Sequence, residues 1–304
     1  MTGLVIKTTG SNYWVHFNDR SVLNCYVKGN FRIRGIRTTN PVAVGDRVKV
    51  STMPDGTNWI TEIEDRKNYI IRRSTNLSKQ SHILAANLDL AALIITLRHP
   101  ETSLTFIDRF LATAEAYNIP ACLIFNKIDL LSQNEKQELE SLRQLYQNIG
   151  YPTLAISAPD CDTSLFSFLN GKITLLSGNS GVGKSTLLNR LLGKDIARTA
   201  DISAIHDTGM HTTTFSEMYP YQNGWIIDTP GIKGFGMTNM QTREMSHYFR
   251  EIFLTSKQCR FNNCTHTTEP QCAVIEAVKN GVIASSRYNS YLSMLSDTEE
   301  GKYR

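Results

Sequence analysis

The fold of this 304-residue chain is decided by the stretch Gly178-Asn179-Ser180-Gly181-Val182-Gly183-Lys184-Ser185. The apolar run Ile173–Ser177 precedes it, and a segment with helical spacing follows it from Lys184 to about Leu192. A glycine-rich loop between a strand and a helix is the setting of a phosphate-binding loop, whereas a plain glycine turn requires neither neighbour. The backbone N–H groups of such a loop and the N-terminus of the following helix hold phosphate groups.

Two side chains of this loop carry its chemistry. We expect the Lys184 ammonium to bridge the β- and γ-phosphates of a nucleotide, and the Ser185 hydroxyl to bind Mg²⁺. The residues expected to surround the phosphates are Gly178, Asn179, Ser180, Gly181, Val182, Gly183, Lys184, Ser185 and Thr186.

A base-reading motif, Asn126-Lys127-Ile128-Asp129, follows the apolar run Leu123–Phe125. A carboxylate at Asp129 can accept both the ring N–H and the exocyclic amine of guanine, and adenine lacks this pair of donors. We expect Asn126 to tie this loop to the phosphate loop, Lys127 to lie along the base, and the Ala158 N–H to read the guanine O6. The expected base contacts are therefore Asn126, Lys127, Asp129, Ser157 and Ala158.

Two further motifs complete a guanine-nucleotide switch. Asp228-Thr229-Pro230-Gly231 closes the apolar strand Trp225–Ile227, and Thr212-Thr213-Thr214 precedes it. We expect Asp228 to hold a Mg²⁺-bound water and the Gly231 N–H to sense the γ-phosphate. Of the three threonines we favour Thr213 as the Mg²⁺ ligand.

The residue that positions the attacking water needs a separate assignment. Ras-like enzymes often place glutamine directly after the glycine of this motif, but Ile232 stands there and cannot orient water. His211 is the best candidate, because a neutral imidazole can accept a hydrogen bond from water. The alternative is a surface histidine. The expected catalytic residues are His211, Lys184 and Gly231.

The order of these motifs is unusual, since the base motif comes before the phosphate loop. All the parts of the switch are present, so the order predicts a circularly permuted GTPase domain. Apolar strands and helical segments alternate from about residue 70 to 233, which is typical of a mostly parallel sheet covered by helices. Each motif then lies at the carboxyl end of a strand, where open α/β sheets bind ligands.

The first 65 residues have a different pattern, with five short strand signals separated by turns. This spacing favours a small Greek-key barrel of the oligonucleotide-binding (OB) type. The first 75 residues carry 12 Lys and Arg against 6 Asp and Glu, so the remainder of the chain has a net charge of −2. A basic module suggests a polyanionic partner, although it can also be only a solvated surface. Aromatic residues of this module either stack on bases or fill the core: Tyr13, Trp14, Phe17 and Trp59.

A cluster of potential metal ligands follows the switch. Cys259-x4-Cys264-x-His266-x5-Cys272 places three thiols and one imidazole in a short segment. Such a set fits a closed tetrahedral Zn²⁺ site with a structural role, although coincidence is the alternative. The other cysteines, Cys25, Cys122 and Cys161, are scattered and are interpreted as buried thiols.

Composition sets limits on the class of protein. Apolar residues make up 41% and charged residues 20%, which favours a folded soluble protein. We expect no signal peptide, no membrane span and no lipid anchor. The fold class predicted is multidomain α/β, with an OB-type β-barrel over residues 1–68, a circularly permuted P-loop GTPase domain over 69–233, and a helical zinc-binding domain over 234–304.

Taken together, these residues resemble the RsgA (YjeQ/YloQ) family of bacterial GTPases of small-subunit ribosome biogenesis. The resemblance extends over nearly the whole chain and includes the barrel, the permuted order, the segment Gly209–Thr214, Cys264-Thr265-His266 and Glu269–Cys272. It implies hydrolysis of GTP to GDP on the 30S subunit late in its maturation, and contacts to 16S rRNA through the barrel and the zinc module. The resemblance also supports His211 as the water-positioning residue. The spacing of the cysteines indicates a reducing cytosol, so we expect a cytoplasmic protein, and we expect a monomer.

Two other functions stay open at this point. One is a GTP-dependent RNA-binding switch with negligible hydrolysis, which turnover measured with and without 30S subunits would distinguish. The other is a general ATPase that acts on nucleic acid, which Asp129 argues against and competition between GTP and ATP would test.

Overall fold

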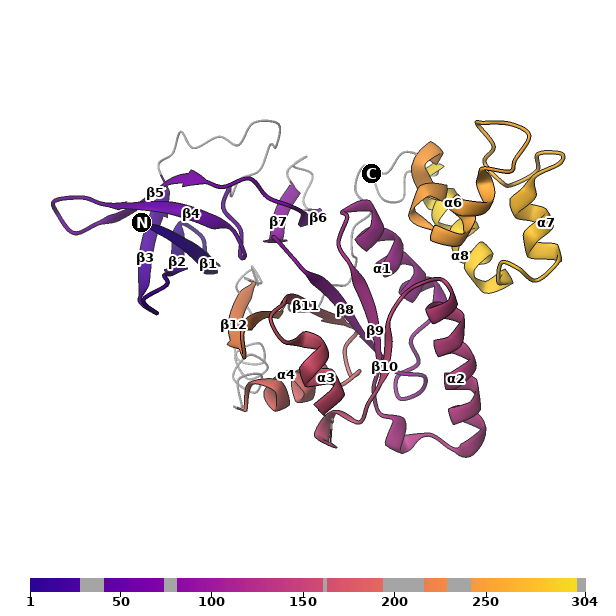
Figure 1. Cartoon of the computed structure of the whole chain (residues 1–304), viewed down its shortest axis with the longest axis horizontal. Helices are drawn as coiled ribbons and strands as arrows, with labels where there is room; N and C mark the ends of the chain where they lie inside the picture. The colour runs from indigo at the N-terminus through magenta and orange to yellow at the C-terminus, as the bar shows by residue number, and fades with distance from the viewer. Residues whose placement is uncertain (28–40, 74–80, 161–162, 194–215, 229–241, 300–304) are drawn as a thin grey trace, which may run out of the picture.

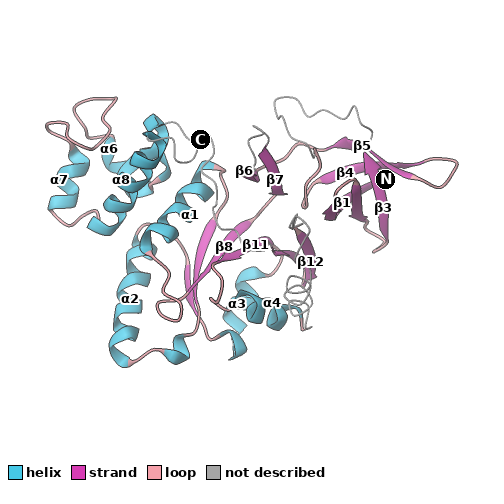
Figure 2. Ribbon diagram, turned by 180° about the vertical axis from the view of Figure 1, so that it is seen from behind, coloured by secondary structure: helices cyan, strands magenta, loops and turns pink. Residues whose placement is uncertain are grey.

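The computed structural model describes residues 1–27, 41–73, 81–160, 163–193, 216–228 and 242–299. Figure 1 shows a β-barrel and a group of C-terminal helices at opposite ends of a central sheet. Figure 2 shows the same arrangement from behind.

The N-terminal module is a closed barrel of five strands. The strand order is β1-β2-β3-β5-β4, and β4 pairs with β1 to close the ring. Alternate residues point inward and form the core, which includes Val15, Cys25 and Ile60. The strands are β1 (Thr2–Thr9), β2 (Asn12–His16), β3 (Val22–Val27), β4 (Arg47–Thr52) and β5 (Asn58–Ile63). The predicted OB-type barrel is confirmed.

The aromatic residues of the barrel divide between its core and its surface. Tyr13 and Phe17 are buried core residues, so they cannot stack on bases. Trp14 and Trp59 are partly exposed, and Trp59 packs against Tyr26.

The central sheet has parallel strands in the order β10-β9-β8-β11-β13, with β12 antiparallel at its edge. Helices α1 and α2 pack on one face and helices α3 and α4 on the other, so that both faces are covered. The strands are β8 (Leu90–Ile95), β9 (Ala121–Phe125), β10 (Thr153–Ala155), β11 (Ile173–Gly178), β12 (Glu217–Tyr221) and β13 (Gly224–Asp228). The helices are α1 (Leu104–Ala116), α2 (Gln133–Asn148), α3 (Thr163–Leu169) and α4 (Lys184–Leu192), with short 3₁₀ turns η1 (Ile128–Leu130) and η2 (Ala158–Asp160).

The barrel and the central sheet are joined by two elements that the sequence did not predict. Strand β12 pairs with β1, with Lys7 opposite Glu217, and the two side chains form an ion pair of 3.1 Å. The hairpin of β6 (Tyr69–Arg73) and β7 (Ser81–Ala86) lies between the two modules, and its Ile70 packs into the core of the central domain. The barrel is thus docked on the central sheet and is not merely tethered by a linker.

The C-terminal module consists of a 3₁₀ segment η3 (Thr242–Tyr248) and helices α6 (Arg250–Ser256), α7 (Ala273–Lys279) and α8 (Ser285–Glu299). Residues 242–256 thus form two helical segments with a break at Phe249. The backbone is extended at Phe249 (φ −114°, ψ 101°), and this ring is buried edge-on against Tyr291. Burial of the aromatic ring determines the break.

A buried ionic network fixes this module to the central domain. Arg287 of α8 donates to Asp108 of α1 at 2.6 Å and to Glu251 of α6 at 2.7 Å. Although burial opposes its charge, Asp108 and Glu251 raise the pKa of Arg287. Asp108 also accepts from the Tyr146 hydroxyl of α2 at 2.8 Å. Helix α1, which begins beside the nucleotide motifs, is thus a structural part of both domains.

Within the described part of the chain, no helix has both the length and the apolar character that crossing a bilayer requires.

Candidate functional site

The phosphate loop leaves β11 and enters α4 as predicted. Gly181 and Gly183 have φ values of +83° and +91°, a region that favours glycine. A Cβ added to Gly183 would lie 2.3 Å from the Asn126 amide nitrogen, and one added to Gly178 would lie 2.7 Å from the Ile94 carbonyl oxygen. Helix α4 begins at Lys184, and its N-cap residue, Gly183, makes no side-chain cap bond. The N-terminus of a helix that follows a glycine-rich loop can hold an anion.

The buried amide of Asn126 joins three motifs. Its Nδ2 donates to the Val182 carbonyl in the phosphate loop at 2.8 Å, and its Oδ1 accepts from the Ala158 N–H at 2.9 Å. The predicted contact between the base loop and the phosphate loop is thus present. Because each of these segments follows a different parallel strand, a single side chain fixes the spacing between the base site and the phosphate site.

Lys127 and Asp129 project from the same loop toward opposite ends of the site. The Lys127 ammonium donates to the Gly181 carbonyl at 2.7 Å and to the His99 carbonyl at 2.6 Å. The exposed Asp129 carboxylate accepts from the Ser157 hydroxyl at 2.6 Å. That bond orients the carboxylate through its Oδ1 atom. The Oδ2 atom takes no part in this bond and can accept a hydrogen bond from guanine.

Lys184 and Asp228 form an ion pair at the carboxyl ends of neighbouring strands. The pair brings together the two residues that sequence reasoning assigned to the phosphates and to the Mg²⁺ shell. The other switch residues, Thr212–Thr214, His211, Gly231 and Ile232, lie outside the described residues, and so does Cys161.

Sequence reasoning missed the loop Leu97–Thr102, which follows β8. Its His99 carbonyl holds Lys127, and the Pro100 ring lies 3.3 Å from the position of a Cβ on Gly181. The Thr96 hydroxyl donates to the Pro100 carbonyl at 2.5 Å and braces the loop. The sequence could have indicated this loop, because it follows the carboxyl end of β8, the strand beside β11. Open α/β sheets bind ligands at this edge.

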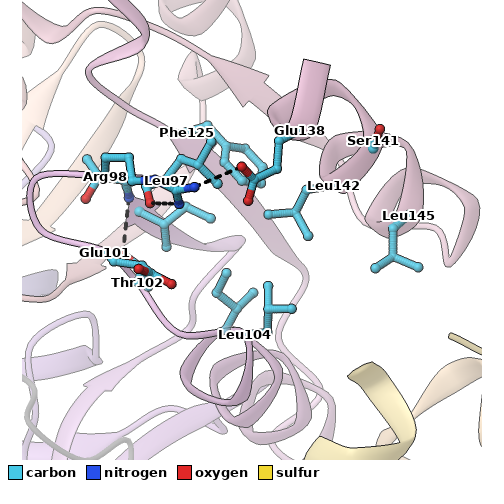
Figure 3. A pocket seen from close by; sticks show the side chains of 13 residues that line it. Leu97, Arg98, Glu101, Thr102, Leu104, Phe125, Glu138, Ser141, Leu142 and Leu145 are labelled. Carbon is cyan, nitrogen blue, oxygen red and sulfur yellow. Dashed lines mark hydrogen bonds and ion pairs between the residues drawn. The ribbon is translucent and has the colours of Figure 1, made fainter. Parts of the chain in front are cut away.

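A cavity of about 380 Å³ lies behind this loop, between α1 and α2. Figure 3 shows Leu104, Leu142 and Leu145 facing the cavity, with Arg98 bound to Glu138 at 2.9 Å on its rim. None of the predicted nucleotide-binding residues lines it. The cavity is therefore distinct from the nucleotide site.

The four predicted metal ligands converge in the C-terminal module. Their ligand atoms all lie within 4.8 Å of one another. The His266 Nδ1 faces two of the thiols, at 3.6 Å from the Cys259 sulfur and 3.4 Å from the Cys272 sulfur. Burial raises the pKa of Cys264 to about 12, and a bound cation would offset this by stabilising the thiolate. Three sulfurs and one imidazole nitrogen at this spacing can hold a metal.

A second layer of bonds fixes the ligand loop. The hydroxyls of Tyr288 and Tyr291 donate to the carbonyls of His266 and Thr265, both at 2.6 Å. Glu269 accepts from the backbone N–H groups of Thr265, Thr267 and Thr268 at 2.5, 2.9 and 3.2 Å. Two tyrosines of α8 and the Glu269 carboxylate thus hold the backbone of the ligand loop in place.

The sequence of this chain matches known proteins over its whole length. Residues 63–238 match the profile of the family described as RsgA GTPase, and residues 2–60 match the RsgA N-terminal domain. The chain belongs to the RsgA GTPase family. A curated relative from Bacteroides fragilis, named small ribosomal subunit biogenesis GTPase RsgA, is 59% identical and covers 100% of this chain and 99% of its own length.

Solved structures agree with this membership of the RsgA family. The structure of YloQ, described as a circularly permuted GTPase, has a TM-score of 0.75 at 27% identity and covers 100% of this chain and 96% of its own. The structure of YjeQ from Thermotoga maritima has a TM-score of 0.77 at 31% identity, with 97% of each chain covered. The predicted fold class and the prediction of a GTP hydrolase are confirmed.

Proposed function

We propose that this RsgA family member hydrolyses GTP on the small ribosomal subunit and assists its late maturation. The observation that supports this most is identity of 59% over the full length to a relative with that name. The partners would be GTP or GDP, the 30S subunit and its 16S rRNA. We also propose a cytoplasmic monomer with domains over residues 1–68, 69–233 and 234–304.

In the proposed nucleotide site, Asp129 reads guanine and Asn126 fixes the distance from the base to the phosphates. When GTP binds, the Lys184 ammonium would leave Asp228 and bind the β- and γ-phosphates. The first N–H groups of α4 would also point toward these phosphates. Ser185, Thr213 and, through water, Asp228 would hold Mg²⁺, which neutralises charge that develops on the phosphates. His211 positions the attacking water, and the Gly231 N–H senses the γ-phosphate.

In the proposed metal site, Cys259, Cys264, His266 and Cys272 bind one structural Zn²⁺. The donor set supports this choice, because three thiolates and an imidazole suit zinc and leave no open coordination position. The metal would stabilise the loop that Glu269 and α8 already organise.

The test is cosedimentation of the chain with purified 30S subunits in the presence of a non-hydrolysable GTP analogue, GDP or an ATP analogue. We expect the chain to pellet with 30S in the GTP analogue, and to pellet much less with GDP. Equal pelleting in all three nucleotides, or pelleting only with 50S, would show that the proposed function is wrong.

A further inference from the structure

A second cavity, of about 490 Å³, lies in the C-terminal module between η3 and the metal-ligand loop. Its lining includes Arg243, His247, Phe261, Asn262 and Asn263, and no lining residue is acidic. The volume falls in the range of small-ligand sites, which is roughly 300–1,000 Å³. The cavity is thus large enough for a nucleotide, and its lining suits an anion.

The floor of this cavity is pre-formed. Thr265, Tyr291 and two of the proposed metal ligands, Cys264 and His266, line it, and the Tyr291 hydroxyl donates to the Thr265 carbonyl at 2.6 Å. The neighbouring Tyr288 holds the His266 carbonyl in the same way. A ligand would therefore meet a fixed surface and would not have to order the loop.

The rim of the cavity carries an exposed aromatic ring with a cation above it. Phe261 is 41% exposed, and the Arg260 guanidinium lies 5.5 Å from its ring centroid. A bond of 3.0 Å to the Gln271 side chain holds Arg260 in that place. Aromatic rings and guanidinium planes are the two surfaces on which unstacked bases stack in RNA complexes.

The polar side chains of the rim face solvent. Asn262 and Asn263 are exposed, and among the described residues no hydrogen bond engages their side-chain amides. An amide offers a donor and an acceptor side by side, which is the arrangement that pairs with a base edge. Arg243 is also exposed and can bind a phosphate.

We propose that this cavity binds one unpaired RNA nucleotide, with the base on Phe261 and its edge toward Asn262 and Asn263. Arg243 would contact the adjoining phosphate. The inference rests on the proposed function, since it assigns a site to RNA of the small subunit. The amides and the aromatic ring favour a nucleotide over an acidic peptide, for which cations alone would suffice.

The test is ultraviolet crosslinking of the full zinc-loaded chain to purified 30S subunits in a GTP analogue, with crosslinked peptides mapped by mass spectrometry. We expect a nucleotide adduct within residues 260–263. Phe261→Leu should remove that adduct and weaken binding of a single-stranded RNA 12-mer by roughly 5- to 50-fold, with an unchanged salt dependence. Leu254→Ala is the matched control, because Leu254 is 62% exposed in the same module and does not line the cavity.

Each outcome of this experiment has a defined meaning. Adducts confined to other parts of the chain, with 30S binding intact, would overturn the nucleotide site and leave the proposed function standing. A crosslink from residues 260–263 to a ribosomal protein would also overturn it. Failure to bind 30S at all would instead contradict the proposed function. Zinc content and melting temperature of Phe261→Leu should match those of the wild type, which excludes misfolding as the cause.

Discussion

Replacement of Arg287 by methionine tests how the C-terminal module is fixed to the GTPase domain. The Arg287 side chain is 1% exposed and bonds to Asp108, which is 0% exposed, and to Glu251. Methionine has a similar length but no charge, so the variant leaves a buried carboxylate without its ionic partner. Removing one member of a buried ion pair costs about 3–5 kcal/mol. We expect a loss of that size in the free energy of unfolding of the C-terminal module.

A second ion pair across the same interface supplies the control. Arg250 bonds to Glu115 at 2.7 Å, but the two side chains are 35% and 24% exposed. Solvent screens this pair, and such pairs contribute about 1 kcal/mol or less. The variant Arg250→Met should therefore lose much less stability than Arg287→Met, although both remove one arginine.

Urea unfolding, followed by hydrogen exchange of α8 and of the central sheet, measures both effects separately. We expect faster exchange in α8 for Arg287→Met, with the central strands little changed. Asp108→Asn in the Arg287→Met background should recover part of the loss, because the uncompensated charge is removed. If Arg287→Met is as stable as Arg250→Met, the buried network stabilises the interface no more than the exposed ion pair does.

Four other perturbations have defined outcomes. Asp129→Asn should weaken GTP binding about 100-fold or more relative to XTP, because the carboxylate that reads guanine donors is lost; isothermal titration with both nucleotides checks this, and an unchanged ratio contradicts it. Cys264→Ser should reduce zinc from one per chain to none by elemental analysis, and retention of a full equivalent would remove this residue from the ligand set. Although burial opposes it, hydrogen bonds from Thr265 lower the pKa of Glu269 to about 2, so its stabilising contribution is present above its ordinary pKa near 4.5 and is lost as the pH falls toward 2. Melting curves between pH 6 and pH 3 should accordingly depend less on pH in Glu269→Gln than in the wild type, and identical profiles would show that the carboxylate does not act this way. His211→Ala should leave GTP affinity intact and lower turnover stimulated by 30S about 100-fold or more, and stimulation equal to that of the wild type would refute the assignment.

Local signals in the sequence were sufficient for the elements that carry the motifs. Helix α4 begins and ends where expected, between Gly183 and Gly193, and strand β9 ends as expected at Phe125, directly before the polar base motif. The base and phosphate motifs also met as predicted, since parallel strands direct their carboxyl ends to one edge. The side-chain contacts of Asn126 follow from that geometry.

The elements that the sequence did not indicate depend on distant partners. The hairpin β6–β7 contains Arg72 and Arg73, and its apolar and polar residues do not alternate clearly. Its position depends on a distant segment, because Ala85 of β7 forms a β-bridge with Val44. The break at Phe249 depends on the position of Tyr291, far along the chain. Helix propensity, which favours continuation, is overridden by this burial.

Some contacts of the site could not be predicted either, because they join residues that are distant in the sequence. The contact of Lys127 with the His99 carbonyl joins two loops. Every residue has a backbone carbonyl, so the residue type at position 99 does not indicate this contact. The sequence also did not predict the ionic network around Arg287, because an arginine in an amphipathic helix usually lies on the solvent-exposed face.

We propose that this circularly permuted GTPase couples GTP cleavage to the small ribosomal subunit. The most direct measurement is the GTP turnover of one zinc-loaded preparation alone, with 30S, with 50S and with 70S particles. We expect slow turnover by the protein alone and a marked increase with 30S subunits that 50S subunits do not produce. Turnover that no particle changes, or that 50S raises as much as 30S, would contradict it.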